Sequence, residues 1–115
     1  MSSTGDLLRD LQAADPAVGG IVAAHLADHG EVLPHLLMAY VARWLLVEGP
    51  RAGVLEALEY HLTVGDEHVQ DVIGTSFIEN LIGEEAAVRW ALGPRLTAEL
   101  RRMEEWEPDA GGPPT

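Results

Sequence analysis

Apolar residues recur at three- and four-residue intervals along most of the chain, and this spacing predicts helices with one buried face. Between residues 51 and 64, the apolar positions that share one helix face are Val54, Leu55, Leu58 and Leu62. No stretch shows sustained alternation of apolar and polar residues, and no Asn-Gly or Asp-Gly pair marks a hairpin turn. The pattern therefore predicts an all-α fold.

Glycine and proline fall where helix caps are expected and divide this pattern into six or seven helices. Ser3 with Asp6 resembles a capping box, and Asp15-Pro16 combines an N-cap with a proline in the first turn. Gly30 is expected to end the second helix in a left-handed conformation. The predicted helices span residues 3–14, 16–29, 34–48, 51–64, 67–81, 84–92 and 94–106.

Two arrangements of these helices are open. Gly30 and Gly65 each separate two helices and lie 35 residues apart, a period found in stacked helical hairpins of the HEAT type. An irregular helical bundle is the alternative. In either case residues 1–105 form one domain, and the acidic, Pro/Gly-rich segment 106–115 is expected to be a disordered tail.

Charge is abundant and one-sided. Nineteen acidic residues face seven arginines and no lysine, which gives a net charge of −12, and residues 48–85 alone carry −8. Such a surface would repel a phosphate backbone, so nucleic-acid binding is not expected. The longest apolar run, 32–47, is interrupted by Arg43 and is too short for a membrane span. The lack of cysteine and of a signal-peptide pattern predicts a cytoplasmic protein.

Catalytic and metal-binding patterns are weak. His25 and His29 are four residues apart, a spacing that two metal ligands can use, but they lie on an apolar stripe and fit core packing with a hydrogen bond to the backbone better. Ser76 lacks a nucleophile-elbow motif and fits close helix packing. His35 is expected to make a first-turn contact, and His61 to be a boundary residue. The sequence therefore predicts a non-enzymatic protein without metal or cofactor.

Three residues are predicted to hold the core together. Trp44, in the most apolar helix, is expected to be buried and to cost about 3–5 kcal/mol when replaced by alanine. Phe77 belongs to the buried face of the 67–81 helix. Arg43 lies in an apolar run, and an internal ion pair with Asp71 or Glu79 is slightly favoured over extension to solvent along a neighbouring aromatic ring.

Several segments together resemble a family of small, uncharacterised bacterial helical proteins, some of which resemble immunity proteins of polymorphic toxin systems. These segments are Leu33–Met38, Val41–Trp44, Val54–Glu59, Gly65–Gln70, Ser76–Leu81 and Gly93–Leu96. The resemblance covers roughly residues 30 to 103 and consists mostly of packing and capping residues. It implies a helical fold and a protein partner, and it supplies no catalytic residues.

The functional hypothesis is a protein-binding module that neutralises a basic toxin through an acidic surface, because long-range charge raises association rates. A helical adaptor or regulatory subunit of a larger bacterial assembly is the alternative. The predicted partner contacts are Glu56, Glu59, Asp66, Glu67, Asp71, Glu79, Glu84 and Glu85. The sequence leaves the oligomeric state open.

Overall fold

The computed structural model describes residues 2–105, apart from the side chain of Glu85, and the tail at 106–115 lies outside the described residues. The described chain is all-helical, as predicted, and contains no strand. No helix in this part of the chain is long and apolar enough to cross a bilayer. The elements are α1 (Thr4–Ala14), α2 (Pro16–His29), α3 (Pro34–Glu48), α4 (Ala52–Val64), α5 (Glu67–Asp71), the π-helix η1 (Val72–Phe77), the 3₁₀ turns η2 (Glu85–Ala87) and η3 (Arg89–Ala91), and α6 (Pro94–Glu105).

The predicted caps are confirmed. The Ser3 hydroxyl accepts from the Asp6 N–H at 3.2 Å, and the Asp6 carboxylate accepts from the Ser3 N–H at 2.9 Å, which completes the capping box. Asp15 accepts from the Ala17 N–H at 3.0 Å and opens α2. Gly30 closes α2 with a φ of 75°, a backbone conformation that glycine adopts without steric cost.

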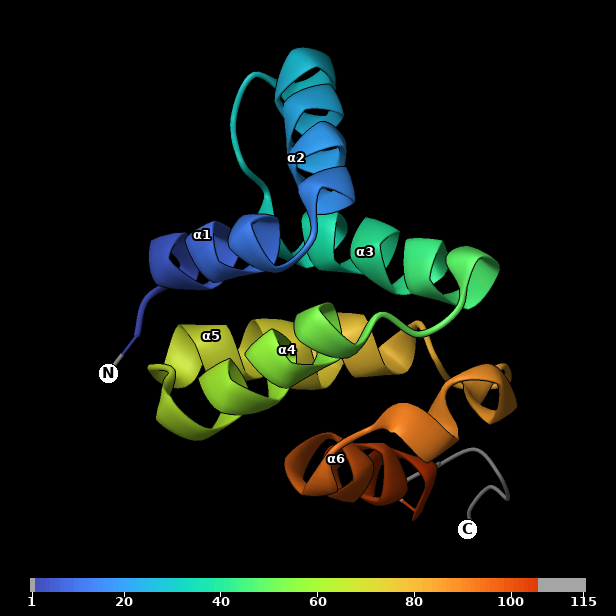
Figure 1. Cartoon of the computed structure of the whole chain (residues 1–115). Helices are drawn as coiled ribbons and strands as arrows, with labels where there is room; N and C mark the ends of the chain where they lie inside the picture. The colour runs from blue at the N-terminus through green and yellow to red at the C-terminus, as the bar shows by residue number, and fades with distance from the viewer. Residues whose placement is uncertain (1, 106–115) are drawn as a thin grey trace, which may run out of the picture.

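Helices that are distant in sequence make the main packing contacts. α1 packs against α4, and α3 packs against η1, so that two layers enclose the core, while α6 covers the lower layer (Figure 1). Stacked hairpins would instead bury each helix mainly against its neighbours in sequence. Of the two arrangements left open by the sequence, the packing therefore favours the irregular bundle.

The three predicted core residues differ in their surroundings. Phe77 is fully buried, as expected. Trp44 is only half-buried and lies at the edge of the core, where the Arg51 guanidinium sits 5.3 Å from its ring centre, so the prediction of a buried Trp44 was wrong. Arg43 is exposed and makes no ion pair with any described residue, because its helix position directs it to solvent. The favoured pairing of Arg43 with Asp71 or Glu79 was therefore wrong as well.

Two predicted helices are irregular. The helix at 67–81 begins as α5 but widens into η1, and such π-segments often occur at functional sites. The expected helix at 84–92 is instead the two short turns η2 and η3, because Gly83 at φ 94° reverses the chain and Val88 at φ −130° leaves the helical region. The side chain of Trp90, which lies in η3, is exposed and does not pack into the core.

Candidate functional site

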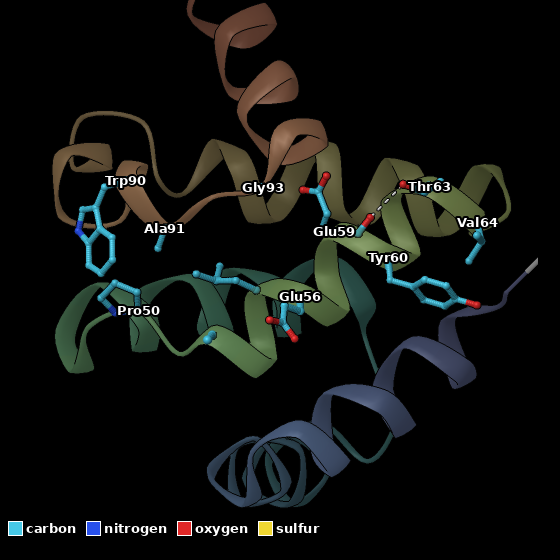
Figure 2. A pocket seen from close by; sticks show the side chains of 11 residues that line it. Pro50, Glu56, Glu59, Tyr60, Thr63, Val64, Trp90, Ala91 and Gly93 are labelled. Atoms are coloured by element: carbon cyan, nitrogen blue, oxygen red, sulfur yellow. Dashed lines mark hydrogen bonds between the residues drawn. The ribbon is translucent and has the colours of Figure 1, made fainter.

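An open groove runs between the outer face of α4 and the segment that leads into α6. Its volume is about 630 Å³, and its floor is largely apolar, with Leu55 and Ala91 among the lining residues. Trp90 and Tyr60 stand toward opposite ends of the groove, with the carboxylate of Glu56 between them (Figure 2). The groove thus combines two aromatic side chains, an apolar floor and a negative charge.

Local sequence explains why these side chains face outward. Glu56, Tyr60 and Thr63 follow one another at intervals of four and three residues on α4, opposite the buried face of that helix. The Tyr60 side chain is 58% exposed. Trp90 lies in η3 and is 77% exposed, the most exposed of the described aromatic residues. An indole with this exposure is unusual in a folded protein and marks a candidate contact surface.

Glu59 lines the same groove but serves the fold. Its two carboxylate oxygens accept from the backbone N–H groups of Arg95 at 2.6 Å and Leu96 at 3.0 Å. It therefore caps the first turn of α6 from another helix. Gly93 is needed for this contact, because a Cβ at that position would lie 2.6 Å from the Glu59 carboxyl group. Figure 2 shows Glu59 directed toward Gly93.

The structure does not gather all the predicted partner contacts in one place. Glu56 and Glu59 share the groove. Asp66 accepts from the Val69 N–H at 2.9 Å and caps α5. Asp71 lies 3.4 Å from the ring of His35 and also accepts from the Thr75 hydroxyl. Three further positions are exposed and do not line the groove: Glu67, Glu79 and Glu84. The side chain of Glu85 lies outside the described part of the structure.

A buried polar cluster, which no motif in the sequence indicates, surrounds His61. This histidine is 1% exposed, although a boundary position was expected. Its Nε2 lies 2.6 Å from the Asp10 carboxylate, and its Nδ1 lies 2.7 Å from the Ser2 hydroxyl oxygen. The Ser2 N–H and C=O also bond to Val64 and Asp66, each at 2.9 Å. The cluster ties the N-terminal segment to the end of α4.

A second cluster of the same composition joins α3 to η1. His35 Nδ1 lies 2.5 Å from the Ser76 hydroxyl, and its Nε2 lies 3.4 Å from Asp71, so His35 makes more than the first-turn contact predicted from the sequence. Ser76 is buried within a continuous helical stretch, where backbone N–H groups are already bonded and cannot stabilise an oxyanion. Neither Ser76 nor Ser2 lines the groove. Both clusters fit cross-links between elements better than nucleophilic sites.

Of the pair predicted to pack in the core, His25 has that role, whereas His29 is exposed. His25 is buried, and its Nε2 accepts from the Leu33 N–H at 2.9 Å, while its ring centre lies 4.6 Å from that of His29. A neutral ring that accepts at Nε2 carries its proton on Nδ1, which leaves no lone pair there for a metal. Among the described side chains, no group of three or more histidines and carboxylates is arranged to hold a metal ion.

Comparisons with protein-family models, with curated proteins and with solved structures found no match to this chain. The α4 groove is therefore the main indication of function in the described part of the chain.

Proposed function

We propose that the chain is a cytoplasmic, non-enzymatic protein-binding module that holds a basic segment of its partner in the α4 groove. The observation that carries this proposal is the 77% exposure of Trp90 at the end of an apolar groove. Tryptophan and tyrosine are enriched among the residues that contribute most binding energy at protein interfaces. Trp90 and Tyr60 together provide two such anchors on one surface.

The charge of the site selects a cationic partner. Glu56 is exposed and makes no ion pair or hydrogen bond with another described residue, so its carboxylate is available to a partner. The net charge of −12 steers basic proteins toward the molecule. Arginine fits better than lysine, because a guanidinium can pair with Glu56 and also stack on an exposed indole. The neighbouring pair of Arg51 and Trp44 shows the same stacking within the chain.

The partner that this proposal favours is a basic toxin domain, with the chain acting as its immunity protein. The resemblance to immunity proteins suggests that the partner is a toxin. The groove offers an apolar, aromatic and negatively charged surface that suits a basic one. An immunity protein must bind its toxin faster than the toxin reaches its target, and electrostatic steering provides that speed. A helical adaptor of a larger assembly would use the same groove for a permanent partner.

Two matched charge reversals test the proposal. Glu56→Lys and Glu67→Lys change the net charge equally, both positions are exposed, and only Glu56 lines the groove. A basic protein captured from the native host and then purified should associate with Glu56→Lys about tenfold more slowly than with Glu67→Lys. Trp90→Ala should weaken the complex by about 2 kcal/mol or more.

The outcomes separate the functions. Equal association rates for the two reversals, together with unchanged affinity of Trp90→Ala, would contradict the groove as the binding site. The proposal also predicts that the wild type captures a basic protein and that Trp90→Ala does not. If no such protein is found, this result counts against the proposal. Inhibition of a toxic activity of the captured protein would identify an immunity protein, whereas a stable complex without inhibition would favour the adaptor.

A further inference from the structure

The helix α2 is apolar on nearly all sides but is covered on only one. Of its fourteen residues, Val18, Val22 and His25 are buried, and its main contacts are with α1 and α3. Figure 1 shows α2 projecting from the rest of the molecule. Its exposed apolar positions are Ala17, Gly20, Ala23, Ala24, Leu26 and Ala27. A helix without a polar face is normally buried all round, so α2 presents a surface suited to a partner.

Gly20 supports this interpretation independently. It lies inside α2, has an ordinary helical backbone, and has nothing within 4 Å of a Cβ built upon it. Alanine would fit there and would favour the helix, so no contact within the described chain explains the glycine. A glycine on an exposed helix face does allow the backbone of a second helix to approach closely.

We infer that α2 is a self-association surface, where a second copy of this chain packs its own α2 in antiparallel orientation. The charge distribution selects a second copy as the occupant. α2 contains a single formally charged residue, Asp28, in a chain of net charge −12. Two copies that meet through α4 and α5 would bring acidic surfaces together, because residues 48–85 carry −8, whereas two α2 helices meet with little repulsion.

Asp28, the one formal charge on α2, is favourably placed in the antiparallel arrangement. Asp28 of each copy then lies beside the N-terminal turn of the other α2, where the helix dipole is positive and no acidic residue occupies the first turn. Arg51 lies at the same end, paired with Asp15 at 3.0 Å. One surface that matches itself about a two-fold axis is the usual basis of a homodimer.

The α2 surface is separate from the α4 groove. Figure 1 shows α2 on one side of the α1 and α3 layer and α4 to α6 on the other. Pairing through α2 would therefore leave the groove of each copy open. The inference stands or falls independently of the proposed function.

Sedimentation of the full chain across protein concentrations from about 1 to about 200 μM tests the inference, because dimer formation depends on concentration. The wild type should shift from monomer to dimer within this range. Gly20→Glu and Ala24→Glu place like charges on the paired faces and should raise the dissociation constant at least about tenfold. The control Ala98→Glu adds the same charge on the exposed side of α6 and should dimerise like the wild type.

A wild type that stays monomeric throughout the range would overturn the inference. Dimerisation of both α2 variants at wild-type strength would also overturn it, since the interface would then lie elsewhere. Glutamate is a good helix former, and Ala24 is exposed, so Ala24→Glu should keep the wild-type circular dichroism spectrum and provides a second folded variant if Gly20→Glu is perturbed.

Discussion

Two carboxylates on the same face of α4 have different tasks, and their hydrogen bonds distinguish them. Glu59 accepts two backbone N–H groups at the start of α6, while Glu56, nearly one turn earlier, is open to solvent. Both appear in the sequence as acids on an amphipathic helix. The α6 donors lie 36 and 37 residues away, so no local pattern assigns the capping role to Glu59.

Replacement of Glu59 by alanine should destabilise the protein by about 1–2 kcal/mol, since two N–H groups of α6 lose their acceptor. Replacement of Glu56 by alanine should change stability by no more than about 0.5 kcal/mol, because the side chain is exposed. Urea denaturation of both variants measures the difference. Equal destabilisation would show that Glu59 does not cap α6.

Asp6 provides a pH-dependent contribution to stability. The Ser3 backbone N–H, followed by the Arg9 guanidinium, holds the pKa of Asp6 below its ordinary value of 3.8. The ionised carboxylate therefore stabilises the folded protein above pH 3.8, and this contribution disappears as pH falls through the lower pKa of the folded state. Urea denaturation at a series of pH values measures the stability difference between wild type and Asp6→Asn. This difference should be constant near neutrality and should shrink toward zero at acid pH. A gap that widens on acidification would contradict the capping box as its source.

Burial distinguishes two aromatic residues that the sequence places together in the core. Phe77→Ala should cost about 3–5 kcal/mol, because the ring is fully buried and belongs to η1, which packs against α3. Trp44→Ala should cost clearly less, because Trp44 is half-buried at the edge of the core. Thermal unfolding of the two variants under one buffer condition would establish the order. A larger loss for Trp44→Ala than for Phe77→Ala would contradict this order.

At the scale of elements, local signals predicted most of the fold. Capping side chains begin α1 and α2, and glycines follow the ends of α2, α3 and α4. The π-segment η1 and the polar clusters around His35 and His61 could not be predicted in this way. Ser2 and Asp10 lie 59 and 51 residues from His61, so only the packing of α1 on α4 reveals their contact.

Gly65 shows that a predicted helix stop can have an unexpected cause. Its φ is −72°, so it ends α4 without a left-handed conformation. Its role is steric, because a Cβ would meet the Val69 side chain and lie 2.5 Å from the His61 carbonyl oxygen. Gly65→Ala should therefore destabilise the protein by about 1–3 kcal/mol. A Cβ at Gly20 meets nothing within 4 Å, so Gly20→Ala should stabilise the monomer by about 0.5–1 kcal/mol. Chemical denaturation at low protein concentration compares Gly65→Ala with Gly20→Ala.

At the scale of the whole molecule, charge repulsion is the dominant long-range force. The net charge is −12, and the molecule measures 44 × 30 × 29 Å. At about 0.01 M salt the Debye length is about 30 Å, so acidic residues repel one another across the entire molecule. At about 0.15 M it is about 8 Å, and only close neighbours still interact. The exposed ion pairs, such as that of Arg9 with Asp6, contribute little in comparison.

Raising NaCl from about 0.01 to about 0.15 M should therefore raise the Tm by a few degrees, because about 1 kcal/mol shifts the Tm of a domain of this size by about 4–8 °C. Measurements at about 1 μM protein keep self-association out of the comparison. The double variant Glu67→Gln, Glu84→Gln removes two exposed charges and should show a smaller salt effect than the wild type. A Tm that falls with added salt would mean that attractive ion pairs outweigh the net repulsion. The acidic surface would then contribute to stability, and its excess of charge could not be attributed to partner attraction alone.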